Sequence, residues 1–403
     1  MKVNLDLINQ YYQELDQVSR ENLNQAIDKI VEVKKKNGKI MVVTGSGPNI
    51  HEGVTVLISE LMDKYIINSV STSSAVIAHE MAGSLDKVKR IEGSRLGFKS
   101  DSNFFPRGGI FEFTKMKESD LEKLKKELIL DEGLLEKSKS IDGDVIIKAA
   151  GNMGYPMGLR TEILSREILN IAQTYNLPFE EVAGWGADKK TMIGKGAEKG
   201  FPVIVSVPQL VGGGAVGLSV GDSISISERS MRIARMLEES DIIIESAIAL
   251  TQEIHDGPFE CYTGHGIWSH WIGFKTYSLK EKTIIRIDLD KQLMQAKLMQ
   301  NENKKIQEAI DQGLPKTKIT GIPFRMEMSA FARHENSIPI VGDIGKIWPI
   351  IAGRAADKLG ISLDFLSYPQ ESEEGKRMRE WIVENVKAID RKKLLKRAQQ
   401  YRL

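Results

Sequence analysis

Nearly continuous apolar runs, separated by helical stretches, constrain the fold of this chain most. Three of them read IMVV, VIVSV and IIIES, at residues 40–43, 203–207 and 242–246. Between them, apolar residues recur at the three- and four-residue spacing of amphipathic helices. Strands of parallel sheets have such runs because helices cover both of their faces. The pattern therefore predicts an α/β fold with a doubly wound, mostly parallel sheet.

The expected strands end on the side where open α/β sheets bind ligands. Several of them end in a glycine or an acidic residue, and ligands bind beyond the carboxyl ends of parallel strands. Helices are expected between them, for example over Gly53–Asp63 and Asp222–Glu239. The predicted strands are Lys39–Thr44, Ile66–Ser71, Asp144–Ala149, Pro202–Val207, Asp241–Ser246, Thr283–Asp288, Ile338–Val341 and Ile361–Leu366.

Composition changes along the chain predict its organisation. Residues 1–37 have helical spacing and are expected to form N-terminal helices, followed by a Rossmann-like nucleotide-binding domain over 38–368. A charged, Lys/Glu-rich stretch of about residues 99–142 predicts a helical insertion or small cap. Residues 257–279 are rich in glycine and aromatic residues and are expected to form a loop over a site. Residues 369–403 are predicted to be a basic helical tail, most simply a solvated face.

Charge and cysteine content exclude several classes of protein. Lys and Arg number 56 and Asp and Glu 55, so the basic excess of nucleic-acid or membrane-surface proteins is missing. The single cysteine, Cys261, cannot form an internal disulfide and fits a reducing compartment. We find no long apolar run and no signal-peptide pattern. The expectation is a cytoplasmic protein that binds a small-molecule substrate, and base rates favour a homo-oligomer.

Two glycine-rich turns are the candidate cofactor site. Each follows an apolar strand and precedes a helix, where glycine lets a phosphate approach the backbone amides. The first turn lacks the G-x-G-x-x-G spacing of the dinucleotide fingerprint, so a plain tight turn is the alternative. For the second, the alternative is a flexible lid or hinge. The glycine-turn residues predicted to bind the cofactor are Thr44, Gly45, Ser46 and Gly47, then Gly212, Gly213 and Gly214.

Acidic residues at two later strand ends extend this prediction. Asp288 and Asp290 are placed to accept hydrogen bonds from ribose hydroxyls, although either could instead cap the next helix. Gly342 and Asp343 repeat the order strand, glycine, acid, helix, and Asp343 is expected to be an N-cap. The loop after the second predicted strand adds Ser73 and Ser74.

The residues predicted to carry chemistry are histidines beside carboxylates. An imidazole next to a carboxylate can transfer protons near neutral pH, and the alternative for each histidine is a structural hydrogen bond. A metal is not favoured, because the dipeptide His79-Glu80 lacks the second helical histidine of H-E-x-x-H. Lys148, Lys195 and Cys261 are weaker candidates. The predicted catalytic residues are His255, Asp256, His265, Glu245, His79 and Glu80.

The order of three stretches resembles a known family. Residues 73–81 (SSAVIAHEM), 241–250 (DIIIESAIAL) and 285–290 (IRIDLD), with 340–349 (IVGDIGKIWP) downstream, are similar to segments of the archaeal ornithine cyclodeaminases. That group is also called lysine-oxoglutarate reductase/saccharopine dehydrogenase-like (LOR/SDH-like). Its NAD-binding domain has the deoxyhypusine-synthase-like NAD/FAD-binding fold, shared with sirtuins. We find no counterpart in the family for residues 255–258 (HDGP), for the aromatic stretch of residues 257–279, or for the insertion of about residues 99–142.

The resemblance implies an NAD-binding enzyme. NAD would lie over Gly45–Gly47, Gly212–Gly214 and Asp288, and hydride would move between the nicotinamide and a small amino-acid-like or amine substrate. His255 or His265 would transfer the proton. Two alternatives stay open: a metal- or His/Asp-dependent hydrolase or lyase on the same fold, and a non-catalytic nucleotide-binding protein.

Overall fold

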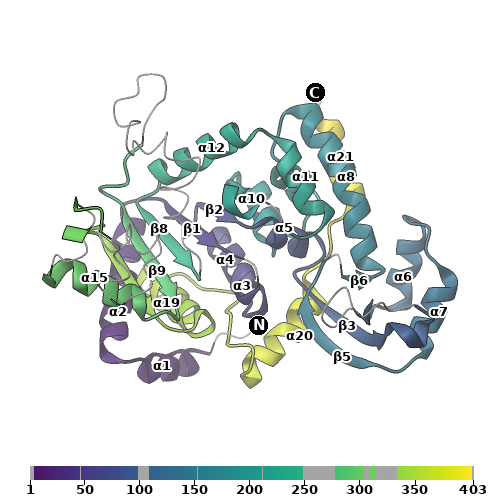
Figure 1. The fold of residues 1–403 in the computed structure, drawn as a ribbon, viewed down its shortest axis with the longest axis horizontal. Coiled ribbons are helices and arrows are strands. Elements are labelled where there is room, and N and C mark those ends of the chain that lie inside the picture. The colour runs from purple at the N-terminus through teal and green to yellow at the C-terminus, as the bar shows by residue number, and fades with distance from the viewer. Residues whose placement is uncertain are drawn as a thin grey trace.

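Six parallel strands form the central sheet of the protein (Figure 1). The structure is a computed structural model, and it describes residues 4–45, 47–98, 109–151, 153–210, 212–247, 277–303, 308–309, 311–314, 321 and 334–401. The strand order is β10-β9-β8-β1-β2-β7, and all five pairings are parallel. The strands are β1 (Ile40–Thr44), β2 (Ser69–Thr72), β7 (Val203–Val205), β8 (Ile242–Ser246), β9 (Thr283–Asp288) and β10 (Ser337–Val341).

The strand order of this sheet is that of a doubly wound Rossmann-like fold. Read from the other edge, the order is β7-β2-β1-β8-β9-β10. If the six strands are numbered along the chain, this is third, second, first, fourth, fifth, sixth. The chain therefore builds outward from β1 in one direction and then, starting with β8, in the other. The predicted fold class is confirmed.

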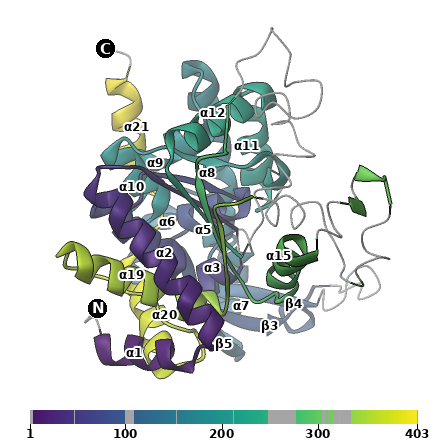
Figure 2. The same ribbon diagram turned by 90° about the vertical axis from the view of Figure 1, so that its left-hand side faces the viewer.

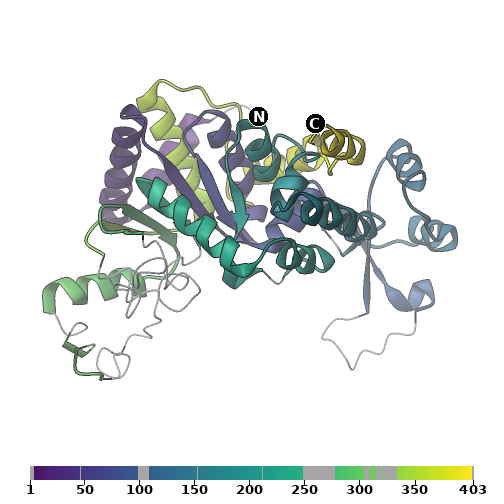
Figure 3. The same ribbon diagram turned by 90° about the horizontal axis from the view of Figure 1, so that it is seen from above.

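Alternate residues of the strands point to opposite faces of the sheet, and each face has its own core. Ile40 and Val42 join the larger core, with side chains of helices α2, α4 and α19. Met41 and Val43 join the smaller one, with residues of helix α12. Figures 2 and 3 show α2 and α19 side by side on one face and α12 along the other.

Helices account for most of the remaining described chain, including the expected helical N-terminal segment. The helices in the first half are α1 (Leu5–Glu14), α2 (Gln17–Lys35), α3 (Pro48–His51), α4 (Val54–Asp63), α5 (Ser74–Met81), α6 (Glu118–Lys125), α7 (Glu132–Ser140), α8 (Met157–Tyr175), α9 (Phe179–Gly184) and α10 (Met192–Lys199). Those in the second half are α11 (Ala215–Ser223), α12 (Ile226–Glu239), α15 (Gln292–Asn303), α19 (Ile344–Leu359), α20 (Glu373–Asn385) and α21 (Arg391–Gln400). No helix in the described ranges is long and apolar enough to cross a membrane.

A second, four-stranded sheet lies at the far end of the molecule (Figures 1 and 3). Its order is β5-β3-β4-β6, with β3 antiparallel to both β4 and β5. Helices α6 and α7 lie within the expected insertion and cover this sheet with Leu121 and Leu135. The strands are β3 (Leu85–Glu92), β4 (Ile110–Thr114), β5 (Asp144–Ala149) and β6 (Gly154–Tyr155).

Two strand predictions need correction. The strand Asp144–Ala149 exists, but it belongs to the small four-stranded sheet, where it pairs antiparallel with β3, and is only partly buried, so its apolar residues do not mark a central parallel strand. The strand predicted at Ile361–Leu366 is absent. There the backbone N–H of Ile361 completes the end of α19 by bonding Ala356, and Asp364 bonds the Glu60 side chain at 2.7 Å. Leu366 is buried without belonging to a sheet, so burial alone produced the apolar pattern.

Candidate functional site

The region at the carboxyl ends of β1 and β8 is the candidate functional site. These neighbouring strands are where the winding of the sheet reverses direction, and open α/β sheets bind ligands at that point. Thr44 and Ser246 end the two strands and lie opposite each other in the register. Both are fully buried, so the groups that can meet a ligand are those that follow them in the chain.

The turn after β1 leaves open space in front of its backbone. Gly45 is buried, and Gly47 has φ +56° and ψ −101°, a conformation that side chains disfavour. A Cβ atom added to Gly47 would find no atom of the described residues within 4 Å. The Gly47 carbonyl accepts hydrogen bonds from Ile50 and His51, which orders the turn. The geometry fits a backbone that a ligand can approach closely. Ser46 lies outside the described residues.

A buried polar network joins the end of β8 to α3 and α19. The Ser246 hydroxyl donates to the Asn49 side chain at 2.5 Å, and the Asn49 amide donates to the Ser246 carbonyl at 3.2 Å. The indole N–H of Trp348 donates to the Ser246 hydroxyl at 2.7 Å. The next residue, Ala247, has φ +53°, which is uncommon for a residue other than glycine. Helix α19 and the turn after β1 are therefore bound directly to the end of β8.

Glu245 and Asp288, two predicted site residues, share one arginine. Arg286 lies opposite Glu245 in the register of β8 and β9, and its guanidinium is 3.4 Å from the Glu245 carboxylate. The same guanidinium donates to Asp288 at 3.0 Å, and Asp288 also accepts the backbone N–H of Asp290 at 3.2 Å. Glu245 is fully buried, whereas Asp288 lies at the strand end and is partly exposed. Only Asp288 is thus positioned to meet a ligand directly.

The second glycine cluster packs against helix α5. The Ser74 hydroxyl lies 3.0 Å from the carbonyl oxygens of Gln209 and Gly212, and a Cβ on Gly213 would come within 2.8 Å of the Ala78 methyl group. Gly213 and Gly214 both have positive φ. Close packing against α5 therefore explains Gly213 without a ligand, and the positive φ of Gly214 favours glycine there. Nearby, Ser73 caps α5 by accepting the Val76 N–H at 3.2 Å.

Asp343 is the N-cap of α19, one of the two roles that its position in the sequence suggested. Its carboxylate accepts the N–H of Gly345 at 2.9 Å. Gly342 precedes it and bonds the Asp288 carbonyl at 2.9 Å. A Cβ on Gly342 would lie 2.8 Å from Ile347, so close packing also favours glycine there.

Glu80 and His79 are adjacent in α5 but serve different elements. Glu80 is fully buried and accepts the N–H groups of Met192 and Ile193 at 2.9 and 3.0 Å, which caps α10. Burial raises the pKa of its carboxyl group to about 7. The Nδ1 atom of His79 contacts the carbonyl of Ala150, and because a carbonyl only accepts, Nδ1 carries the proton. The Nε2 atom of neutral His79 is then an acceptor.

Basic side chains gather where the small sheet meets the central one. Arg379 of α20 donates to the carbonyl of Ile147 in β5, and Lys148 is bound to Glu112 at 2.7 Å. His51 of α3 lies near both cations. Burial lowers the pKa of His51 first, followed by the charges of Arg379, His79 and Lys148. Burial also lowers the pKa of His79. The pKa values of both imidazoles are thus lowered, and the side chains of Arg379 and Lys148 lie close to His51.

Glu52 was missed by the sequence analysis. It follows His51 directly, is buried, and accepts the backbone N–H of Gln370 at 2.7 Å. Burial first, and then the charges of Asp343 and Glu371, raise its pKa to about 7 against the opposing hydrogen bond from Gln370. The dipeptide His51-Glu52, coming directly after the glycine turn, was the available signal. No sequence signal pointed to Arg379, because it lies in residues 369–403, which were interpreted as a solvated basic tail.

Three predicted catalytic residues, His255, Asp256 and His265, lie outside the described residues, as does Cys261. Lys195 of helix α10 binds Asp63, the last residue of α4, at 3.0 Å and Glu198 of its own helix at 2.7 Å. Within the described ranges, no three His, Cys, Asp or Glu side chains are grouped to hold a metal.

Comparisons with known proteins give only distant similarities. No family model matches the chain, and no curated protein matches its sequence. Among solved structures, ArgZ, an arginine dihydrolase from the ornithine-ammonia cycle in cyanobacteria, matches with 11% identity and a TM-score of 0.39 over 85% of this chain. A conserved LOR/SDH protein from Methanococcus maripaludis S2 matches with the same identity and TM-score over 86% of this chain and 70% of its own.

A third similar structure is AgrE, solved in a ternary complex with ornithine and NAD+, at 11% identity and a TM-score of 0.39. This chain spans about a third of the length of ArgZ and AgrE, with 33% and 34% of those chains covered. At this level of similarity, the activities of these proteins do not transfer to the chain.

Proposed function

We propose that the protein is an enzyme that binds NAD over the ends of β1 and β8 and acts on a small amino-acid-like substrate. The strand order of the central sheet is the observation that carries the proposal. In sheets of this order, a dinucleotide lies across the point where the winding reverses, with its pyrophosphate over the turn after the first strand. Here that turn is Gly45–Gly47.

The residues at the turn fit such a cofactor. The space in front of Gly47 is open, and its positive φ presents the backbone of the turn without a side chain. The network of Asn49, Ser246 and Trp348 holds the turn and the end of β8 in a fixed relation. Asp288 is the nearest predicted ribose partner on the β9 side. These features supply a rigid floor, which a bound dinucleotide requires.

The basic side chains around His51, four residues after Gly47, suggest the substrate class. Arg379 can hold a carboxylate with charge-assisted hydrogen bonds, since a guanidinium group is among its strongest partners, and Lys148, which is paired with Glu112, lies close by. Neutral His51 and His79 can accept a proton from an amine or hydroxyl near pH 7. A substrate that carries both a carboxylate and an amine matches this arrangement.

In the proposed reaction, bound NAD supplies the hydride acceptor, and this chain supplies the charges and the proton acceptor. Arg379 would orient the carboxylate, and Nε2 of His79 is available for the proton. His255 and His265, with Asp256, remain proposed for proton transfer from the segment that follows β8 in the sequence. For Glu80, predicted to be catalytic, the contacts with α10 favour a structural role instead.

Thermal unfolding with and without NAD+ tests the cofactor site. NAD+ that binds the folded state stabilises it by about 2.7 kcal/mol at a concentration one hundred times Kd. Gly47→Ala is expected to abolish this NAD+-induced shift because its methyl group enters the open space. Gly360→Ala is the control, because Gly360 has φ +68° and open space at the far end of α19.

A second pair of variants avoids backbone strain. Pro48 is exposed at the start of α3, and Pro48→Glu places a negative charge beside the turn. We expect it to weaken NAD+ binding by tenfold or more through repulsion of the pyrophosphate, whereas neutral Pro48→Gln keeps binding. The absence of any NAD+-induced shift in the wild type would reject the cofactor. A shift without any turnover would favour a nucleotide-binding protein without catalysis, and activity abolished by chelation would favour the hydrolase or lyase alternative.

A further inference from the structure

Strand β7 is an edge strand of the central sheet, so no strand pairs with its outer side. On its inner side, the carbonyl of Pro202 and the N–H of Ser206 form hydrogen bonds with β2. Because peptide groups alternate along a strand, those of Val203 and Val205 point to the free side. Glu180 accepts the Val205 N–H at 2.6 Å, and Arg229 donates to the Val205 carbonyl at 3.2 Å. Val203 retains a donor and an acceptor that face outward.

A cavity lies along this edge. Its volume is about 390 Å³, within the range of small-molecule sites. Val203 and Ile204 of β7 line it together with residues of α9, α10, α12 and α21. Most of this lining is apolar, as in sites that bury a ligand's ring, and the peptide groups of Val203 supply directional hydrogen bonds at its base.

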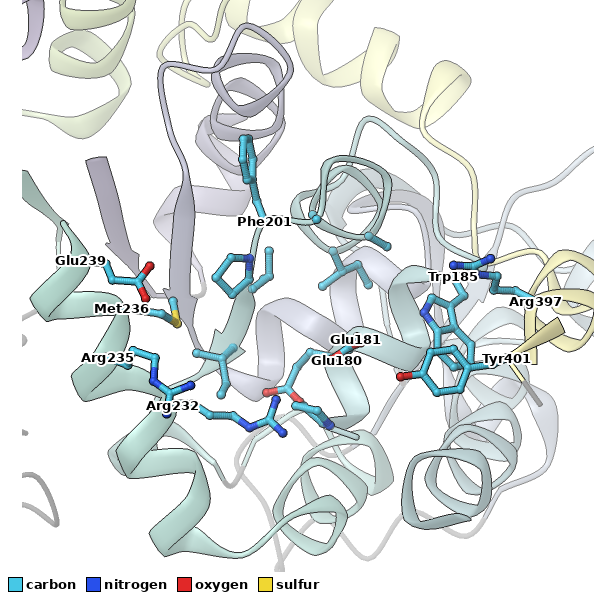
Figure 4. A pocket seen from close by; sticks show the side chains of 18 residues that line it. Glu180, Glu181, Trp185, Phe201, Arg232, Arg235, Met236, Glu239, Arg397 and Tyr401 are labelled. Atoms are coloured by element: carbon cyan, nitrogen blue, oxygen red, sulfur yellow. The ribbon is translucent and has the colours of Figure 1, made fainter. Parts of the chain in front are cut away.

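Arginines and aromatic residues stand at the two ends of the cavity (Figure 4). Arg232 and Arg235 of α12 lie at one end. Arg397 of α21 lies at the other, beside Trp185 and Tyr401, whose ring centroids are 5.2 Å apart. Arg232 is already bound to Glu228 at 2.6 Å, so Arg235 and Arg397 are the guanidinium groups better placed to meet an anion.

A basic hollow adjoins the Arg397 end. It has a volume of about 330 Å³ and shares Trp185, Ala197 and Arg397 with the cavity. Lys393 and Lys396 of α21 line it as well. Its acidic residue, Glu198, is bound to two lysines, Lys189 and Lys195. The hollow therefore has a net positive charge that suits a phosphate, and it gives the basic tail a function beyond solvation.

We propose that the cavity and the hollow together form a second binding site, separate from the NAD site, for a purine nucleotide. The base pairs through one acceptor and one donor with the N–H and carbonyl of Val203, and lies against the apolar lining. The phosphate reaches Arg397, Lys393 and Lys396. A base alone would leave the basic hollow empty, and a phosphate alone would leave the apolar cavity empty, so the nucleotide is the occupant that uses both.

Calorimetric titration of the full chain with AMP and GMP tests the proposal. Adenosine and inorganic phosphate are the component probes, and each is expected to bind at least tenfold more weakly than AMP. The titration is repeated with saturating NAD+. AMP binding that persists under saturating NAD+ supports a separate site, and loss of binding would place AMP at the NAD site and overturn the proposal.

Variants locate the bound nucleotide. Arg397→Gln removes one charge-assisted contact and is expected to weaken AMP binding by about tenfold or more. Arg377→Gln, an exposed arginine of the neighbouring helix α20, is the control and should leave binding unchanged. Ala197→Phe, at an exposed position where the two spaces meet, should block AMP without changing the NAD+-induced shift. Equal AMP affinity in the wild type and these variants, or no binding of either nucleotide, would reject the site.

Discussion

Trp348 and Ser246 are joined by a hydrogen bond of 2.7 Å from the indole N–H to the serine hydroxyl, and both side chains are fully buried. The bond connects the start of α19 to the end of β8. Because Ser246 also binds Asn49 of α3, the helix directly after the β1 turn, a single hydroxyl couples three elements at the candidate site. Four predictions follow from contacts of this kind.

The first concerns the indole itself. Trp348→Phe keeps an aromatic ring in the core but removes the N–H, and it also leaves space where the larger ring was. We expect the free energy of unfolding to fall by about 1–3 kcal/mol, because the buried Ser246 hydroxyl loses a donor. Denaturant unfolding measures the change. Trp381→Phe, at a partly buried position, is the control and should cost less.

The second concerns two glycines of α11. A Cβ on Gly217 would lie 2.1 Å from the Gly212 carbonyl oxygen, whereas a Cβ on Gly221 would find open space. Gly217→Ala should destabilise the protein by about 1–3 kcal/mol through overpacking. Gly221→Ala should stabilise it by about 0.5–1 kcal/mol through helix propensity. Thermal unfolding of both variants checks the contrast, and equal effects would contradict the close packing of Gly217 against Gly212.

The third concerns a buried ion pair. Glu180 and Arg229 are fully buried in contact with each other, and both bind the backbone of Val205. Arg229→Gln leaves the Glu180 carboxylate without its counter-charge, and we expect a loss of about 3–5 kcal/mol in the free energy of unfolding.

A surface pair provides the comparison. Arg391 binds Glu167 through two hydrogen bonds of 2.7 and 2.6 Å, but both side chains are partly exposed. Arg391→Gln should cost less than about 1 kcal/mol because water screens the pair. Similar losses from the two arginine variants in chemical unfolding would show that Arg229 is not buried as described.

The fourth concerns pH. The pKa of Glu52 is raised to about 7 by burial, so the folded protein binds a proton there that the unfolded chain releases near pH 4.5. This raised pKa favours folding at low pH, and the contribution is lost as the pH rises from about 4.5 through about 7. Glu52→Gln should remove this part of the pH dependence. Unfolding between pH 5 and 8 measures it.

Glu80 has a similarly raised pKa, so it serves as the matched comparison. Glu80→Gln is expected to flatten the same pH range but also to weaken the cap of α10, since an amide oxygen is a poorer acceptor than a carboxylate for two N–H groups. An unchanged pH profile in both variants would show that neither carboxyl group is protonated in the folded protein near pH 6.

The sequence alone supported the sheet because its strands are locally encoded. The run IIIES predicted a central strand, and the structure has β8 at Ile242–Ser246, buried throughout. The prediction for Asp144–Ala149 failed in its placement, since a short apolar run does not reveal which sheet it joins. The glycines at Gly212–Gly214 were interpreted as ligand contacts, although at Gly213 the close approach of helix α5 also requires glycine.

What the sequence determined by itself is the class of fold and the turn after β1. Apolar period, glycine position and helix caps act over a few residues, so they can be recognised without the rest of the chain. Only the tertiary structure decided the strand order and the proximity of His51, Lys148 and Arg379, which come from three separate elements. These side chains come together because segments far apart in the chain pack against each other. A local sequence pattern does not show which distant segments will be in contact.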